Sequence, residues 1–396
     1  MRVGLIIPEP LSSGGVSSYA RDLIRMAPRD IDFTLIAQSS NDNHGFDLSQ
    51  SLDRVTLVRL PPRKHDFLSN VKIQAFIFLQ LRKICQEEKI EIIHTHFGHM
   101  PDIAIRVKQL KIPIIATAHN SSVILSEAIR SSRMSYSRLD KTSRYLISLS
   151  PLIGTLEKFY LRSRFLISPS RWFSQQLGSR FHVPSNKIFN IPNGIDTNEF
   201  KPIDAFQRLN DRKTIIFLGR ISALKGIDVL CRAISILSSE RYHLRLIIVG
   251  AGDLGAYRNE LNLLRLKGVE IKCMGHTKRE AIPEILASCD VALSASYIEN
   301  ASMSILEAMA CGLPVIASDV GGTSEIITHN QNGLLFPSGD SEALSHLLAE
   351  LLYDDVLRSR LGKAARKTVV ESFNGLTMAK MTHDAYESIL ERAVIS

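Results

Sequence analysis

Short apolar segments typical of strands alternate along this chain with longer amphipathic segments typical of helices. In the first half, the expected strands are Val3–Ile7, Phe33–Ala37, Val55–Leu60, Ile90–Thr95, Ile112–Thr117, Tyr145–Leu149, Phe165–Ile167 and Lys187–Ile191, with helices such as Asn70–Glu88 and Leu152–Tyr160 between them. Strands separated by helices join as βαβ units into a parallel sheet. The first half is therefore expected to be an α/β domain.

A second alternation follows residues 191–204 (IPNGIDTNEFKPID), whose prolines and Asn-Gly pair are typical of a linker. The expected strands are Thr214–Leu218, Leu244–Val249, Val269–Cys273, Val291–Ser294 and Val315–Ser318, and the expected helices are Ile227–Ser238, Leu254–Leu266, Arg279–Ala287, Ser341–Lys367 and Thr377–Ala393. A chain of 396 residues is long for one core. We expect two Rossmann-like domains, 1–203 and 204–374, that face each other across a cleft, because open α/β sheets bind ligands at the carboxyl ends of their strands.

The composition indicates a soluble protein, with 45% hydrophobic and 22% charged residues. The longest apolar run, Val71–Leu81, is shorter than the roughly 20 residues of a membrane span. The opening MRVGLIIPEP has no room for a signal sequence before Pro8, so a cytoplasmic location is expected. The five cysteines form no CxxC pair, which favours reduced thiols over a disulfide framework or a zinc site.

The net charge of +8 lies entirely in the first half, where 27 Lys and Arg face 17 Asp and Glu across residues 1–203. The densest basic segment is IRSSRMSYSRLDKTSR, which contains Arg130, Arg133, Arg138, Lys141 and Arg144. A solvated surface and an attraction to anionic lipid headgroups or an anionic acceptor both explain this segment. Nucleic acid is not expected as a partner, because the segment has a single aromatic residue and no recognised binding motif.

The segment 290–322 (DVALSASYIENASMSILEAMACGLPVIASDVGG) carries the strongest functional signal. Its two carboxylates, Glu299 and Glu307, flank the start of a helix at the carboxyl end of a strand. A helix N-terminus attracts phosphate, and carboxylates accept hydrogen bonds from sugar hydroxyls. The local alternatives are a solvated loop acid at Glu299 and a capping box formed by Ser304 and Glu307. The pair together predicts a ligand that carries phosphate and hydroxyl groups.

The segment 219–226 (GRISALKG) places Arg220 and Lys225 between a strand and a helix N-terminus. A planar guanidinium and a compact ammonium at this place suit a diphosphate. A pair of surface cations in an ordinary turn is the alternative.

Glycines and histidines give weaker signals in the first half. Gly14 and Gly15 follow the first strand and permit close approach of a ligand, although a plain βα turn fits the spacing equally well. His94, His96 and His99 lack an acid or cysteine that would complete a metal site, so no metal is expected. His119, in TAHN after the strand 112–117, is expected to face the cleft, with a structural loop histidine as the alternative.

These segments together resemble the retaining glycosyltransferases of the GT-B fold, specifically glycosyltransferase family 4. The resemblance spans nearly the whole chain and includes the Gly14-Gly15 turn, IIHTH, TAH, SPS at 168–170, IPNGID, GRISALKG, VGAGD at 249–253 and the two-acid segment. It implies a retaining, metal-independent, hexosyltransferase-type reaction between a nucleotide-diphosphate sugar and an acceptor hydroxyl. It also implies that the last helix, in residues 375–396, packs back on the first domain.

The resemblance assigns roles to individual residues. Arg220 and Lys225 match the basic pair that holds the donor diphosphate, Glu307 matches the acid that binds the ribose, and Glu299 matches the acid that contacts the transferred sugar. The donor site further includes Gly15, Gly250 and the backbone of Met303, Ser304 and Ile305, and His119 matches the histidine beside the reacting sugar. No cofactor beyond the donor co-substrate is implied.

The chain departs from the family pattern at two places. Asn300-Ala301-Ser302 replaces a common Gly-Phe-Gly, and Ala295 replaces a common proline. Both changes affect the loop over the sugar, so the sugar and the nucleotide base stay open, although a UDP-sugar is expected. The acceptor is expected to be a glycan, a glycolipid or a small molecule, in cell-surface polysaccharide synthesis with peripheral membrane attachment. A nucleotide-sugar epimerase and a non-catalytic donor-binding subunit are the alternative functions.

Overall fold

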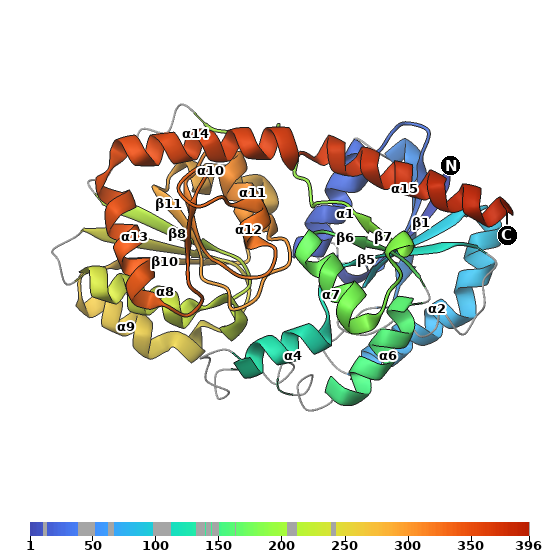
Figure 1. The fold of residues 1–396 in the computed structure, drawn as a ribbon, viewed down its shortest axis with the longest axis horizontal. Coiled ribbons are helices and arrows are strands. Elements are labelled where there is room, and N and C mark those ends of the chain that lie inside the picture. Colours follow the sequence, from blue (N-terminus) through green and yellow to red (C-terminus); the bar gives the residue numbers. More distant parts are fainter. Residues whose placement is uncertain are drawn as a thin grey trace. The chain divides into compact units, whose positions relative to one another are not determined.

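The computed structural model describes residues 1–10, 14–38, 52–61, 67–97, 112–131, 139, 144, 150–162, 164–203, 212–238 and 243–395. The chain forms two compact units, each with its own parallel sheet (Figure 1). The first unit comprises residues 1–124, 149–194 and 375–396, and the second comprises residues 125–148 and 195–374.

The first unit contains a seven-stranded sheet in the order β3-β2-β1-β4-β5-β6-β7. Its strands are β1 (Arg2–Pro10), β2 (Asp32–Gln38), β3 (Val55–Leu60), β4 (Ile92–Phe97), β5 (Ile114–Ala118), β6 (Phe165–Ser168) and β7 (Ile188–Asn190). Every neighbouring pair is parallel, as the alternation predicts. The expected strand Tyr145–Leu149 lies outside the described residues.

The helices of the first unit are α1 (Gly15–Met26), α2 (Phe67–Glu87), the start of α4 (Ser122–Ser131), α6 (Ser150–Arg162), α7 (Arg171–Phe181) and α15 (Gly375–Ile395). Helix α15 packs along α1, and Tyr386 and Ile389 join Tyr19 and Leu23 in one apolar core (Figure 1). The expectation that the last helix returns to the first unit is therefore confirmed. Among the described helices, none combines the length and apolar content that a membrane-spanning segment requires.

The second unit contains a six-stranded parallel sheet in the order β10-β9-β8-β11-β12-β13. Its strands are β8 (Lys213–Leu218), β9 (Leu244–Val249), β10 (Glu270–Gly275), β11 (Val291–Ser294), β12 (Val315–Ser318) and β13 (Leu334–Phe336). Its α-helices are α8 (Ile227–Leu237), α9 (Arg258–Leu266), α10 (Ile282–Ala287), α11 (Met303–Ala310), α12 (Thr323–Ile326), α13 (Ser341–Tyr353) and α14 (Asp355–Ser372). Helices lie on both faces of the sheet (Figure 1).

One helix expected at Ser341–Lys367 is two helices in the structure. Asp354 has extended backbone angles and its Oδ1 accepts a hydrogen bond from Leu357 N at 2.8 Å, so it caps the start of α14. A polar residue with this geometry ends one helix and begins the next. The sequence pattern of apolar residues continues across Asp354, which is why periodicity alone joined the two helices.

The strand order reverses between β8 and β11. From β8 the chain proceeds through β9 to β10 on one side, whereas β11 leads to β12 and β13 on the other. Ligands of open α/β sheets bind beyond the carboxyl ends of the strands at such a reversal. The turn after β8 and the loop after β11, which hold the predicted cations and acids, meet at this point.

Candidate active site

The turn after β8 packs directly against the loop after β11. Gly226 adopts a φ of 65°, and a Cβ placed on it would lie 1.8 Å from the carbonyl oxygen of Ala295. Tyr297 N donates to Leu224 O at 2.9 Å across the same contact. Only glycine combines this left-handed conformation with so close an approach, so Gly226 fixes the position of Lys225.

Lys225 and Glu299 meet at this contact. Lys225 Nζ lies 2.5 Å from Glu299 Oε2, and the two side chains are 28% and 13% exposed. Ser296 Oγ donates to the same carboxylate oxygen at 3.4 Å, and Gly322 N donates to the carbonyl oxygen of Glu299 at 3.1 Å. The structure therefore brings together two of the predicted site residues, which the sequence separates by 74 positions.

Arg220 and Gly250 lie on adjacent turns of the same edge. A Cβ on Gly250, which has a φ of 144°, would lie 1.9 Å from Gly219 O and 3.5 Å from Arg220 N. The Arg220 side chain is exposed and forms no ion pair with any described residue. The backbone of the 219–221 turn thus passes close to Gly250 and leaves a guanidinium at the surface of this edge.

The start of helix α11 is capped by Ser302. Its Oγ accepts from Ile305 N at 3.4 Å, and its carbonyl oxygen accepts from Leu306 N at 3.2 Å. Because the capping residue is Ser302, the alternative of a capping box between Ser304 and Glu307 is wrong. The side chains of Met303 and Ile305 are buried in the apolar core, so these two residues can offer a ligand only their backbone.

Glu307 instead forms a buried ion pair that the sequence did not suggest. Its Oε1 lies 3.4 Å from Arg279 Nη1, and Arg279 Nε lies 3.3 Å from Glu199 Oε2. All three side chains are at most 15% exposed, and the Arg279 guanidinium lies 4.7 Å from the Phe200 ring centroid. Arg279 therefore holds the carboxylate of Glu307 in a fixed orientation. Nothing in the local sequence around Arg279 indicates this role.

In the first unit, His119 is partly buried and belongs to a cluster of three histidines with the buried His94 and His96. The rings of His94 and His96 stack with centroids 4.7 Å apart, and those of His96 and His119 stack at 5.3 Å. His94 and His96 share one face of β4, and His96 pairs with Thr117 of β5, which places His119 two residues farther along on that face. His96 Nδ1 and His119 Nε2 lie 2.9 Å apart.

Burial keeps these imidazoles neutral. It lowers the pKa of His94 to about 3, with a further contribution from His119, and lowers the pKa of His119 to about 4. The pKa of His96 is lowered well below its ordinary value by burial and by its two histidine neighbours. Removal from water disfavours the charged imidazolium. His119 therefore enters any chemistry at neutral pH as an uncharged group.

Two tyrosines from distant elements complete the cluster. The ring of Tyr19, in α1, makes edge contacts at 5.3 Å with both His96 and His119. Tyr386 OH, in α15, lies 2.6 Å from His94 Nδ1. Because Tyr19 is four residues after Gly15, the start of α1 lies one helical turn from the cluster. This spacing between Gly15 and Tyr19 is visible in the sequence and could have indicated that Tyr19 lies near the site. Tyr386 carries no comparable signal.

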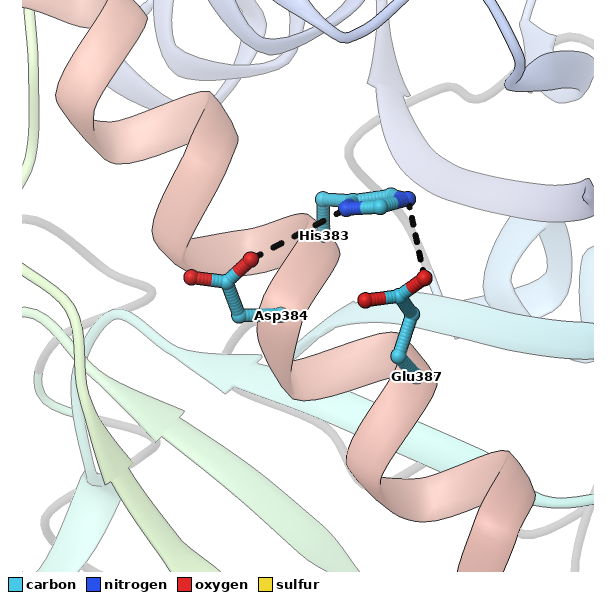
Figure 2. Close-up of side chains that lie close together, drawn as sticks. All are labelled: His383, Asp384 and Glu387. Carbon is cyan, nitrogen blue, oxygen red and sulfur yellow. Dashed lines mark ion pairs between the residues drawn. The ribbon is translucent and has the colours of Figure 1, made fainter.

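The histidine cluster is a group of side chains of the kind that can ligate a metal ion. Both nitrogens of His94 already face hydroxyl groups, of Tyr386 and of Thr117 at 2.7 Å, and His99 lies outside the described residues. A second group, His383, Asp384 and Glu387, lies on α15 (Figure 2). Asp384 approaches Nδ1 of His383 at 3.9 Å while Glu387 approaches Nε2 at 3.8 Å, so the carboxylates sit on opposite edges of one ring.

Asp384 and Glu387 lie on α15 with His383, so their contacts with the His383 ring stay within one helix. His383 Nε2 also lies 3.4 Å from Asp30 Oδ2, in the segment before β2. Of the basic segment found in the sequence, the larger part, including Arg133, Arg138 and Lys141, lies outside the described residues.

Comparison with solved structures defines the class of fold. Sucrose-phosphate synthase from Thermosynechococcus elongatus superposes with a TM-score of 0.78 at 22% identity, covering 99% of each chain. HepE of Anabaena, solved in complex with UDP-glucose, superposes with a TM-score of 0.70 at 19% identity, covering 98% of this chain and 100% of that one. This chain therefore has the GT-B fold. It consists of two parallel α/β units, and its last helix packs on the first unit.

Two family models, taken together, cover most of the chain. The model "Glycosyltransferase Family 4" matches residues 13–199, and the model "Glycosyl transferases group 1" matches residues 200–368. The chain belongs to glycosyltransferase family 4, the glycosyl transferases group 1. A phosphatidyl-myo-inositol mannosyltransferase of Mycobacterium leprae is 27% identical over 404 residues, which cover 98% of this chain and 97% of that protein. The resemblance found in the motifs is thereby confirmed.

Proposed function

We propose that this glycosyltransferase moves a sugar from a nucleotide-diphosphate sugar to an acceptor hydroxyl with retention of the anomeric configuration. The observation that carries the proposal is the meeting of Lys225 with Glu299 at the strand reversal between β8 and β11. HepE of Anabaena binds UDP-glucose, which supports a UDP-sugar as the donor here.

The donor diphosphate occupies the turn after β8 in this proposal. Arg220 is exposed there, Lys225 lies at the end of the turn, and helix α8 begins directly after Gly226. A helix N-terminus and two cations stabilise the charge that grows on the departing diphosphate. This electrostatic stabilisation is the main source of rate enhancement, and it requires no metal ion.

In this proposal, the loop and the helix after β11 bind the sugar and the ribose. Glu299 contacts the transferred sugar, and Glu307 accepts hydrogen bonds from the ribose hydroxyls, oriented by Arg279. The backbone at Met303–Ile305 faces sugar hydroxyls and phosphate. Front-face attack, in which the leaving phosphate takes the acceptor's proton, accounts for retention without a carboxylate nucleophile.

In this proposal the first unit binds the acceptor, and the family resemblance assigns His119 the role of the histidine beside the reacting sugar. Residues 1–203 carry a net charge of +10, and the Mycobacterium leprae relative is named for a phosphatidyl-myo-inositol substrate. Both observations favour a glycolipid or polysaccharide precursor at an anionic membrane surface. Sedimentation with anionic liposomes at low salt tests this part: binding supports it, and recovery of all the protein in the supernatant contradicts it.

Transfer assays with a panel of UDP-, GDP-, ADP- and dTDP-sugars test the proposed reaction. Lys225→Ala is expected to lower the transfer rate at least tenfold, about 1.4 kcal/mol, because it removes one diphosphate cation. Lys363→Ala, which removes an exposed lysine of α14, is the matched control. Unchanged kinetics in Lys225→Ala contradict the site, and a product of inverted configuration in proton NMR contradicts retention.

The same assays separate the alternative functions. An epimerase would convert the donor in the absence of any acceptor, whereas a transferase requires one. A non-catalytic subunit would bind nucleotide without transfer to any acceptor. The Lys225–Glu299 pair and the fixed Glu307 are the charged groups that the resemblance assigns to the reaction, and their presence favours the transferase over the non-catalytic subunit.

A further inference from the structure

The hydrogen bonds of the histidine cluster determine which nitrogen of His119 carries its proton. His96 is buried, with 1% of its surface exposed. Its Nδ1 lies 2.9 Å from His119 Nε2, while its Nε2 is buried without a hydrogen-bond partner among the described residues. A neutral imidazole has one N–H donor and one bare nitrogen, so only two arrangements of the pair exist.

In the first arrangement, His119 donates from Nε2 and His96 keeps its proton on Nε2. That N–H would then be a buried donor with no acceptor. In the second arrangement, His96 donates from Nδ1 to His119 Nε2, and only a lone pair of His96 stays unpaired. Buried N–H groups without a partner are rarer in proteins than under-satisfied acceptors, so the second arrangement costs less.

We propose that His96 donates its Nδ1 proton to Nε2 of His119, so that His119 carries its own proton on Nδ1 and His96 is the residue that fixes this tautomer. The neighbours of His96 hold it in place for this role. His94 stacks on one side of it and is itself anchored by Tyr386 and Thr117, while the edge of the Tyr19 ring packs against it.

The consequence for catalysis rests on the proposed function. With its Nε2 lone pair engaged by His96, His119 offers a substrate no basic nitrogen from that edge of the ring. Every hydrogen bond that it donates comes from Nδ1. His119 thus acts as a neutral donor that orients a sugar hydroxyl, and His96 acts as a positioning residue that touches no substrate.

Nitrogen-15 NMR on protein labelled at histidine measures the tautomers directly, without substrate. Two-bond couplings between ring protons and nitrogens distinguish Nδ1–H from Nε2–H imidazole. Loss of signals in His96→Asn and His119→Gln assigns the two residues among the 12 histidines. The expected result at pH 7 is the Nδ1–H form for both. An Nε2–H form or a charged ring at His119 overturns the proposal.

Two substitutions of His96 separate positioning from folding. His96→Asn keeps an amide donor close to the place of Nδ1, whereas His96→Leu fills the space with no donor. We expect His119 to stay in the Nδ1–H form in the Asn variant and to populate both forms in the Leu variant. An unchanged tautomer in folded His96→Leu protein contradicts the role of His96, and the wild-type spectrum decides the tautomer even if this variant does not fold.

Kinetics then tests the link to the reaction. The kcat of sugar transfer is expected to fall in His96→Leu and to recover in part in His96→Asn, with little change in the KM for the donor. Equal kcat values in the Leu and Asn variants contradict the positioning role. If the wild type transfers no sugar, the proposed function fails, while the tautomer assignment is still decided by the spectra.

Discussion

Lys225 Nζ and Glu299 Oε2 lie 2.5 Å apart, so the cation assigned to the donor diphosphate is paired with the acid assigned to the donor sugar. The ion pair is partly sheltered, since the side chains are 28% and 13% exposed. A diphosphate that enters the site must compete with Glu299 for Lys225. Under the proposed assignment of Lys225 and Glu299, the two ends of the donor are coupled through this one contact.

Replacement of Glu299 by Gln tests this coupling. The change keeps the size of the side chain and frees Lys225 from its acid, so binding of UDP alone should be unchanged or tighter. Transfer of sugar should nevertheless slow at least tenfold, about 1.4 kcal/mol, because the carboxylate no longer contacts the sugar. Calorimetry of UDP binding and transfer kinetics measure the two effects. Glu342→Gln, the same change at an exposed position of α13, is the control.

Weaker UDP binding in Glu299→Gln would mean that the acid supports the diphosphate site and does not compete with it. Equal rates of transfer in Glu299→Gln and in Glu342→Gln would remove Glu299 from the sugar site.

Arg279 is expected to be essential for the stability of the second unit. Arg279→Gln leaves Glu199 and Glu307 buried without their cation, which should lower the free energy of unfolding by about 3 kcal/mol. Adding Glu199→Gln should recover part of the loss, because one unpaired charge is then removed. Urea unfolding measures both. Lys213→Gln, which breaks an exposed pair with Asp355, should cost less than about 1 kcal/mol.

Equal costs for Arg279→Gln and Lys213→Gln would contradict the assignment of a buried ion-pair network at Glu307.

Gly226 is expected to tolerate no side chain. Gly226→Ala would place a Cβ 1.8 Å from the carbonyl oxygen of Ala295 at a φ of 65°, so the turn after β8 must move away from the loop after β11. We expect lower stability and, in the protein that still folds, donor binding at least tenfold weaker, about 1.4 kcal/mol. Gly178→Ala in α7, where a Cβ meets nothing within 4 Å, should be neutral or stabilising by about 0.5 kcal/mol. Similar behaviour of the two variants would contradict the packing described for Gly226.

The stability of the first unit should depend on pH through its buried histidines. The pKa values of His94 and His119 are about 3 and about 4, against 6.5 for a free imidazole. Between about pH 4 and 6.5 the unfolded chain therefore binds protons that the folded chain does not. Stability should rise with pH in this window, by at most about 1.4 kcal/mol per pH unit for each group.

Glu157 acts in the opposite direction. Burial raises its pKa from 4.5 to about 7, against the hydrogen bonds that it accepts from Ser122 N and Val123 N. Its folded form keeps a proton that the unfolded chain has lost, so its contribution falls as pH rises from about 4.5 to 7. Because the buried histidines outnumber this acid, the net free energy of unfolding should rise between pH 5 and pH 7.

Urea unfolding at pH 5, 6 and 7 checks both contributions. His94→Gln should flatten the rise, Glu157→Gln should steepen it, and His346→Gln, at an exposed site in α13, should leave it unchanged. A wild-type stability that is constant across this range would contradict the neutral state assigned to the cluster.

Local sequence signals predicted the elements but not their long-range partners. The bounds of β3 and β11 agree with the expected Val55–Leu60 and Val291–Ser294, because turn residues flank both apolar runs. β4 and β5 begin two residues later than expected, since Ile90 and Ile112 at the start of each run belong to the preceding loop. β13 was missed, because three residues carry too little pattern.

The candidate site shows the same contrast between residues with a local sequence signal and partners that lie far away in the sequence. The cations at Arg220 and Lys225 and the acids at Glu299 and Glu307 could be proposed from the sequence, because they lie in two short motifs that follow β8 and β11. The partner of Glu307 could not be, since Arg279 lies 28 positions away with no motif of its own. The alternative of a capping box placed the cap of α11 at Ser304, because Ser302 and Ser304 are two residues apart and only the backbone angles of Ser302 identify the cap.

Isothermal titration with UDP-glucose, and with other nucleotide sugars if UDP-glucose does not bind, tests most directly whether the turn 219–226 holds the diphosphate of a nucleotide sugar. We expect that one of these nucleotide sugars binds the wild type and Lys363→Ala with equal affinity, and binds Lys225→Ala at least tenfold more weakly, about 1.4 kcal/mol. Equal affinity for wild type and Lys225→Ala, or no binding of any nucleotide sugar to the wild type, would contradict this role of the turn.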